Sequence, residues 1–205
     1  MTIHRSHVIS WNLTQRCNLE CEHCYISGGK ISKEEAEGEL STEECFKVID
    51  EMALVNPEAL LILTGGEPLL RKDVFDIATY ANEKGFWVVV GTNGVFLTEK
   101  LCERMTAAGI RGVSLSLDGL DAETHDRFRN VRGAWKNTVE GSQTLAKMGI
   151  PYIVQTTVGR HNHNDVAKIA TMAHDLGASV FNLYFLVSTG RGTHVTDVNP
   201  EEYEE

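Results

Sequence analysis

The sequence predicts an α/β fold built on a parallel sheet of six strands. Six short apolar runs are spaced along the 205 residues, and amphipathic segments with apolar residues at every third or fourth position lie between them. Glycines stand between four of these segments and the next apolar run, and glycine can take the left-handed conformation that ends a helix. Strict alternation of strands and helices is typical of a parallel sheet.

The six predicted strands are apolar runs with the lengths that strands usually have. In chain order they are HVISWNL at 7–13, ALLIL at 59–63, FWVVV at 86–90, GVSLSL at 112–117, YIVQTTV at 152–158 and VFNLYFL at 180–186. The predicted helices lie in the connections between them.

Helices are predicted where apolar residues recur at helical spacing. The clearest stripes are formed by Phe46, Ile49, Met52 and Ala53 and by Val166, Ile169, Ala170 and Ala173. The glycines that mark helix ends are Gly85, Gly109, Gly149 and Gly177. Cys45 and Cys102 lie on or beside such stripes, so we expect them to be buried structural side chains. A last helix is predicted to begin with Asn199 as its N-cap and Pro200 in its first turn.

Composition and charge narrow the class of protein. With 19 basic and 29 acidic residues the chain has a net charge of -10, which argues against nucleic-acid binding because that requires clustered Lys and Arg. No run approaches the ~18 apolar residues of a membrane span, and the N-terminus lacks the apolar core of a signal peptide. We therefore expect one soluble, cytoplasmic domain over residues 1–205, with its cysteines available to metal or redox chemistry.

Polar and cysteine-rich segments follow the predicted strands. In a parallel βα fold the loops after the strands open on one face, and ligands bind there. In chain order these segments are TQRCNLECEHC, TGGEP, GTNG, DG, GRHNHND and STGRGTH. The residues that can carry chemistry are therefore expected together on one face.

Three cysteines, Cys17, Cys21 and Cys24, lie in the first of these loops without a fourth nearby. Three thiolates suit a [4Fe-4S] cluster whose fourth iron takes another ligand, because each cysteine binds one corner. One alternative is a zinc ion with His23 as fourth ligand, although His23 lies directly beside Cys24. Another is a redox pair of Cys21 and Cys24, which leaves Cys17 unexplained. The spacing favours the cluster.

The pattern Cys17-x3-Cys21-x2-Cys24, together with GGEP at the end of the second strand, resembles the signature of the radical S-adenosylmethionine (SAM) enzymes. The resemblance covers nearly the whole chain and implies a partial (β/α)6 TIM-like barrel. It also implies that SAM binds the open iron through its amino and carboxylate groups. An electron from the cluster, delivered by a donor such as ferredoxin or flavodoxin, then cleaves SAM to methionine and a 5'-deoxyadenosyl radical.

The resemblance further implies which residues contact SAM. The implied cofactor-binding residues are His23, Gly65, Gly66, Glu67, Pro68, Thr92, Ser116 and Asp118. The GGEP residues form the edge that receives the methionyl amino group, and glycines let the backbone approach closely. His23 takes the place of an aromatic residue that packs on adenine. Tight turns with Asx bonds explain Asn93-Gly94 and Asp118-Gly119 almost as well.

Within the family, the segments LSLDGLDAETHDRFRN, TTVGRHNHND and FNLYFLVSTGRG are most similar to the radical SAM proteins of haem biosynthesis. Those proteins make the dioxo-isobacteriochlorin haem or act in the sirohaem-dependent haem route, and the resemblance implies an iron tetrapyrrole substrate. The candidate substrate contacts are Arg127, Arg129, Arg132, Arg191, His161, His163 and His194. Arginines hold carboxylates well, whereas a solvated basic stretch and structural histidines are the simpler interpretation.

Two other functions remain open at the level of sequence. The first is a radical SAM maturase of a ribosomally made peptide, as in the pyrroloquinoline quinone and mycofactocin pathways. The second is an electron carrier or metal-binding module that uses the same cysteines. Relatives in haem biosynthesis normally continue into a cysteine-rich C-terminal domain with auxiliary clusters, so we expect this chain to be a core domain that ends at the start of its last helix.

Overall fold

The computed structural model describes residues 7–30, 38–194 and 201. In this part of the chain six parallel strands form one sheet in the order β1-β2-β3-β4-β5-β6. The strands are β1 (Val8–Thr14), β2 (Leu60–Gly65), β3 (Trp87–Thr92), β4 (Val113–Ser116), β5 (Tyr152–Val158) and β6 (Val180–Phe185). All six predicted strands are thus confirmed, and the sheet is the partial barrel that was expected.

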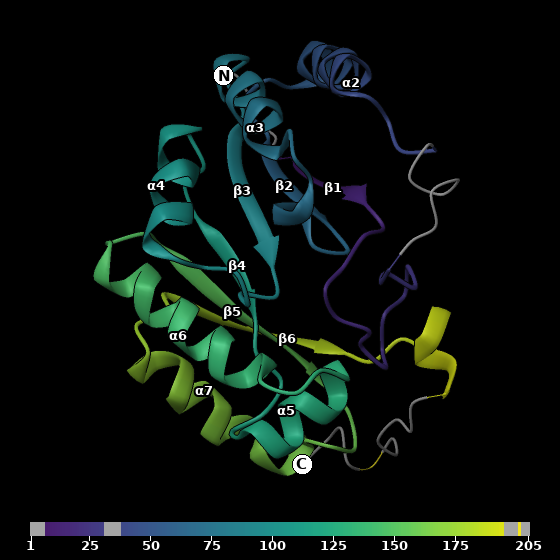
Figure 1. Cartoon of the computed structure of the whole chain (residues 1–205), viewed down its shortest axis with the longest axis vertical. Coiled ribbons are helices and arrows are strands. Elements are labelled where there is room, and N and C mark those ends of the chain that lie inside the picture. Colours follow the sequence, from purple (N-terminus) through teal and green to yellow (C-terminus); the bar gives the residue numbers. More distant parts are fainter. Residues whose placement is uncertain (1–6, 31–37, 195–200, 202–205) are drawn as a thin grey trace.

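Helices provide the connections between the parallel strands. They are α2 (Thr42–Val55), α3 (Val74–Glu83), α4 (Glu99–Ala107), α5 (Ala122–Arg129), α6 (Ala134–Lys147) and α7 (Val166–Asp175), with short 3-10 turns η1 (Pro68–Leu70), η2 (His163–Asp165) and η3 (Gly190–His194). Figure 1 shows α4, α6 and α7 along one side of the curved sheet, which leaves its other side as the barrel interior.

Local sequence explains where these helices begin and end. Ser41 and Glu44 form a reciprocal capping box at the start of α2, which satisfies two backbone donors that the helix leaves free. The four predicted helix-ending glycines all have positive φ, for example 104° at Gly85 and 77° at Gly109. Between β4 and β5 the chain forms two helices instead of one, because Asn130 turns it in a left-handed conformation with φ 55°.

The hydrophobic core lies between the sheet and the helices. Its strand residues alternate along each strand, as in Leu61 and Leu63 of β2 or Val88 and Val90 of β3. Cys45 and Cys102 are fully buried in this core, as predicted. The strand residues that alternate with these, such as Leu60, Ile62 and Val89, line a cavity of about 290 Å³ inside the barrel.

No helix in the ranges 7–30 and 38–194 is both long and apolar enough to cross a membrane. The predicted cap at Asn199 and Pro200 lies outside the described residues.

Candidate functional site

The three cysteines lie in one loop that follows β1. The loop closes on itself through backbone hydrogen bonds from Cys17 N to Gly29 O at 2.9 Å and from Gly29 N to Gln15 O at 3.1 Å. Cys17, Cys21 and Cys24 all line a cavity of about 180 Å³. The three cysteines of the first loop therefore meet at one cavity in the structure.

An N–H donor lies at each of the three sulfurs. The Leu19 amide is 3.4 Å from Cys17 Sγ, and the Gly28 amide is 3.2 Å from Cys24 Sγ. The Arg129 guanidinium Nη1 is 3.7 Å from Cys21 Sγ. Thiolates that bind an iron-sulfur cluster accept such hydrogen bonds, so the donor set fits this group.

Burial also makes the thiols of Cys17 and Cys21 depend on a metal for ionisation. It raises the pKa of Cys17 to about 11, and it raises the pKa of Cys21 as well despite the nearby Arg129. A buried thiol keeps its proton unless a cation compensates the thiolate charge, and iron provides that charge when it binds. The loop is therefore suited to bind metal rather than to present free thiolates.

The described residues contain no group of three His, Cys, Asp or Glu side chains placed to hold a single metal ion. A [4Fe-4S] cluster does not need one, because each cysteine binds a different iron.

The ring of His23 stacks on Phe128 with centroids 4.3 Å apart, and Phe128 stacks on His161 at 3.8 Å. His23 also lines the cavity. Its packing on adenine stays a prediction.

The GGEP segment is joined directly to the cysteine loop. Glu67 N donates to Arg16 O at 2.7 Å, and Gly66 N donates to Thr14 O at 2.8 Å. A Cβ on Gly66 would lie 2.2 Å from Arg16 O, which only glycine avoids. Gly65 and Gly66 line the cavity beside the cysteines, whereas Pro68 is buried at the start of η1.

The Glu67 carboxylate is directed into the protein. It accepts hydrogen bonds from Thr92 Oγ1 at 2.9 Å and from Asn93 N at 2.9 Å, and its burial raises the pKa of Glu67 to about 7. These contacts argue against a direct bond from this carboxylate to SAM. The side chain instead ties the edge after β2 to the loop after β3, which keeps Thr92 at the cavity wall.

Ser116 and Asp118 differ in position although both follow β4. Ser116 lines the cavity as expected. Asp118 is 0% exposed; it accepts a hydrogen bond from Thr157 N at 2.8 Å and pairs with Arg129, whose Nε is 2.6 Å from Oδ2. Both carboxylate oxygens are therefore engaged inside the protein, which argues against the predicted contact of Asp118 with SAM.

Two of the four candidate substrate arginines are engaged by the protein itself. Arg129 binds Asp118 and Cys21. Arg191 donates to Cys21 O at 2.9 Å and to Gly28 O at 2.8 Å, so η3 holds the cysteine loop from the far end of the sheet. Figure 1 shows this yellow segment beside the purple loop after β1. Their side chains meet backbone, sulfur and carboxylate, yet both also line the cavity of the cysteines, so their contacts with a substrate stay a prediction. Arg127 and Arg132 are exposed.

The candidate histidines are brought only partly together. His161 belongs to the ring stack with Phe128, and burial lowers the pKa of His161 to about 4, so its imidazole is neutral. His163 lies in η2 and His194 in η3. Contacts of these histidines with a substrate stay a prediction.

A second cavity of about 450 Å³ adjoins the first. The two share residues His23, Tyr25, Ser116, Arg129 and Gln155. The far wall of the second cavity is formed by Tyr184, Phe185, Leu186 and Val187 at the end of β6. A ligand in the second cavity would therefore lie next to whatever occupies the first.

Sequence reasoning missed three residues of this site. Asn93 donates to Asn18 Oδ1 at 2.9 Å and also lies 3.9 Å from Cys17 Sγ. Gln155 lines both cavities, and a polar residue within the apolar run YIVQTTV was a signal for it. Tyr25 directly follows Cys24 and donates to Asn12 Oδ1 at 3.0 Å.

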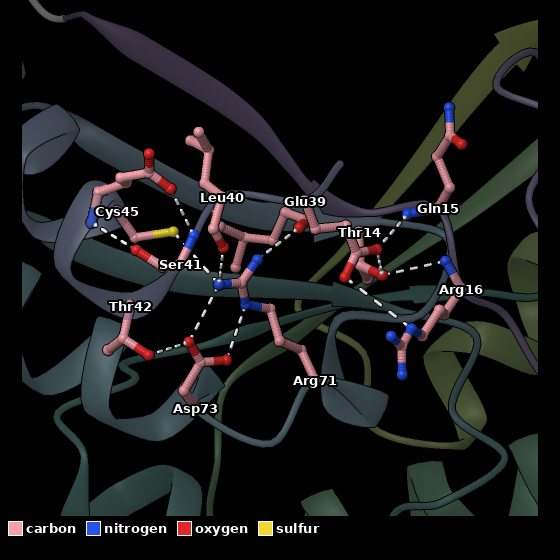
Figure 2. A network of polar contacts seen from close by, with 12 residues as sticks. Thr14, Gln15, Arg16, Glu39, Leu40, Ser41, Thr42, Cys45, Arg71 and Asp73 are labelled. Atoms are coloured by element: carbon pink, nitrogen blue, oxygen red, sulfur yellow. Dashed lines mark hydrogen bonds and ion pairs between the residues drawn. The ribbon is translucent and has the colours of Figure 1, made fainter. Parts of the chain in front are cut away.

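Figure 2 shows the polar network that fixes the end of β1, where the cysteine loop begins. Arg71 donates to Leu13 O at 2.9 Å and to Leu40 O at 2.6 Å. Its Nε is 2.7 Å from Asp73 Oδ1. Glu39 accepts hydrogen bonds from Thr14 Oγ1 at 2.5 Å and from Gln15 N at 3.2 Å. The loop is thus anchored at its start as well as by Arg191.

A partial parallel barrel in which a three-cysteine loop, a glycine edge and the β3 loop meet at one cavity defines the core of a radical SAM enzyme. Comparison with known families agrees, because the model of the Radical SAM superfamily matches residues 11–175. The chain belongs to this superfamily. Its members use a [4Fe-4S] cluster and SAM, and the described residues fit both.

Known relatives and a solved structure extend this assignment. The AdoMet-dependent heme synthase of Methanosarcina barkeri is 44% identical over 197 residues, which cover 96% of this chain and 55% of that protein. The mycofactocin maturase MftC of Mycobacterium tuberculosis is 35% identical over 194 residues, which cover 94% of this chain and 48% of that protein. The chain spans about half the length of the curated relatives it matches.

The solved structure of SuiB from Streptococcus suis bound to S-adenosylmethionine aligns with a TM-score of 0.75 at 13% identity, over 95% of this chain and 44% of SuiB. This similarity confirms the fold.

Proposed function

We propose that this chain is the core domain of a radical SAM enzyme that modifies side chains of an iron tetrapyrrole in haem biosynthesis. The observation that carries the proposal is the set of three cysteine sulfurs, each with an N–H donor, around one cavity that Gly65, Gly66 and Ser116 also line. When bound, the cluster supplies the electron that cleaves SAM to methionine and a 5'-deoxyadenosyl radical.

The protein's own residues would bind and orient the reactants. Gly65 and Gly66 offer backbone at the cavity wall for the methionyl group, and Thr92 and Ser116 offer hydroxyl groups. Phe128 stacks on one face of the His23 ring. The other face of the His23 ring would then be presented to the adenine. The buried Glu67 would keep the glycine edge at a constant distance from the cysteine loop.

The proposed substrate class rests on similarity and on the second cavity. The relative named for haem synthesis is more similar than the mycofactocin maturase, at 44% against 35% identity. The wall of Phe185, Leu186 and Val187 suits an apolar ring system, and the shared residues would place this ring next to SAM. Arg127 and Arg132 are exposed and remain our candidates for the substrate carboxylates.

An electron donor such as ferredoxin or flavodoxin would reduce the cluster, and a reducing compartment such as the cytoplasm would keep the cysteines ready for iron. All five cysteines are free thiols, which supports that location.

Anaerobic assays test the proposal in two stages. Reconstituted protein should cleave SAM to 5'-deoxyadenosine after reduction, and failure of SAM to perturb the paramagnetic spectrum of the reduced cluster would favour an electron carrier. A sirohaem-type porphyrinoid should then bind with a shift of its Soret band, and binding should weaken in Arg127→Ala with Arg132→Ala. Arg111→Ala, at an exposed position two residues before β4, serves as the control.

The peptide maturase is the second candidate function, because a mycofactocin maturase is similar over nearly the whole chain. Equal porphyrinoid affinity in the wild type and the double arginine variant, combined with SAM cleavage stimulated by a precursor peptide, would favour it.

A further inference from the structure

The three candidate cluster ligands receive hydrogen-bond donors of different charge. Neutral amide N–H groups lie at Cys17 Sγ and Cys24 Sγ, from Leu19 and Gly28. At Cys21 Sγ the donor is the guanidinium of Arg129, at 3.7 Å. Among the described residues, the guanidinium of Arg129 is thus the charged group that donates to the sulfur of a candidate cluster ligand.

Arg129 does not act alone, because its guanidinium is paired with a second buried charge. Asp118 is 0% exposed and Arg129 is 7% exposed, and Nε of Arg129 lies 2.6 Å from Asp118 Oδ2. Water does not screen charges at this depth, so each charge acts strongly on its neighbours. The sequence of contacts from Asp118 through Arg129 to Cys21 therefore couples a carboxylate to a ligand sulfur.

Three elements of the barrel fix this arrangement. Arg129 ends α5, Asp118 follows β4, and the amide of Thr157 in β5 donates to Asp118 Oδ1 at 2.8 Å. The Asp118 amide donates to His125 Nδ1 at 3.1 Å. Because the carboxylate is held from two sides, the guanidinium is held at one position relative to Cys21.

Such a pair has opposite effects on the reduction of a cluster bound to Cys21. Reduction adds one negative charge to the cluster and its thiolates, and a positive guanidinium at the sulfur stabilises that added charge. The carboxylate behind it acts in the opposite direction and partly cancels the guanidinium. The balance between the two charges would set how readily the cluster accepts its electron.

We infer that Arg129 and Asp118 are positioning residues that set the reduction potential of the cluster through the hydrogen bond to Cys21. This inference rests on the proposed cluster. It assigns the buried pair a role that is separate from binding of the substrate, because Arg129 reaches the sulfur directly and Asp118 reaches it only through Arg129.

The test is a redox titration of the reconstituted full chain without SAM, followed by the paramagnetic signal of the reduced cluster. In Arg129→Gln the ratio of reduced to oxidised cluster at a fixed potential should fall about tenfold, which corresponds to about 59 mV for one electron. In Asp118→Asn the ratio should rise. The double variant should lie between the two single variants.

Two further variants separate charge from structure. Arg129→Lys keeps the positive charge, so its ratio should lie closer to that of the wild type than the ratio of Arg129→Gln does. Arg104→Gln removes an arginine of α4 that packs on Phe75, with its guanidinium carbon 4.2 Å from the ring centroid, and should leave the ratio unchanged.

Iron content separates failure of the inference from failure of the proposed function. A wild-type protein that takes up no cluster would refute the proposed function. A loaded cluster with the same ratio in the wild type, Arg129→Gln and Asp118→Asn, or with shifts of equal sign in Arg129→Gln and Asp118→Asn, would overturn the inference. Should Arg129→Gln fail to load, Asp118→Asn decides the result: a raised ratio supports the inference and an unchanged or lowered ratio overturns it.

Discussion

Thr92 Oγ1 lies 2.9 Å from both carboxylate oxygens of Glu67, and this contact is buried beneath the cavity. It joins the GGEP edge to the end of β3, although the two residues are 25 positions apart. Burial of Glu67, rather than a charged partner, has the largest effect on the pKa of its carboxyl group.

Glu67 should make the stability of the metal-free protein depend on pH. Its pKa is raised from 4.5 to about 7, so the folded state holds the proton more tightly than the unfolded state does. The resulting stabilisation is full below pH 4.5 and is lost as the pH rises through 7, in total about 3 kcal/mol at 1.36 kcal/mol per pKa unit. The difference between the wild type and Glu67→Gln in urea unfolding at pH 5 and pH 8 measures this loss, because buried histidines such as His161, whose pKa is lowered to about 4, make both proteins less stable at the lower pH.

Glu67→Gln should remove the contribution of Glu67 to the pH dependence, because the amide stays neutral and keeps an oxygen acceptor. Glu123→Gln, at an exposed position in the first turn of α5, is the control and should keep the dependence of the wild type. A change in stability between pH 5 and pH 8 that is equal in the wild type and Glu67→Gln would show that Glu67 makes no such contribution.

Replacing Cys17, Cys21 or Cys24 by alanine should abolish cluster assembly, because each thiolate binds one corner. Anaerobic reconstitution of the wild type should yield about four irons per chain. Cys102→Ala is a matched control, since Cys102 is a buried cysteine inside α4. A full iron complement in the triple alanine variant would rule out these ligands.

Gly66→Ala should destabilise the protein strongly. The added Cβ would lie 2.2 Å from Arg16 O, and the backbone that joins the GGEP edge to the cysteine loop would have to move apart, at a cost of about 2–4 kcal/mol. Gly29→Ala is the control, because its Cβ would lie 3.6 Å from Glu20 Cγ in ordinary contact. Equal unfolding midpoints of the two variants would contradict this expectation.

Arg191→Gln should weaken the hold on the cluster without removing a ligand. The variant loses hydrogen bonds to Cys21 O and Gly28 O, each worth about 1.5–3 kcal/mol when the donor is charged and less where it is partly exposed. Iron release to a chelator should therefore become roughly tenfold faster or more. Exposed Arg132→Gln should leave the rate unchanged, and an unchanged rate in Arg191→Gln would show that η3 does not stabilise the loop.

Much of the fold followed from the sequence, because strands and helices depend on local apolar patterns and on helix-ending glycines such as Gly85. The cysteine loop also followed from local spacing. The roles of Arg129 and Arg191 did not, because their partners Cys21 Sγ and Cys21 O are 108 and 170 positions away. Sequence reasoning assigned both arginines to substrate, since it cannot distinguish a guanidinium that faces a ligand from one that faces a backbone carbonyl.

The contacts of Arg191 have a consequence for the order in which the site matures. A ribosome releases the three cysteines long before it releases Arg191, which is 170 positions beyond Cys21, and domains generally fold as units. The loop therefore acquires its last hydrogen bonds only after β6 has joined the sheet. Until that moment the cysteine loop lacks the two hydrogen bonds that Arg191 donates to Cys21 O and Gly28 O.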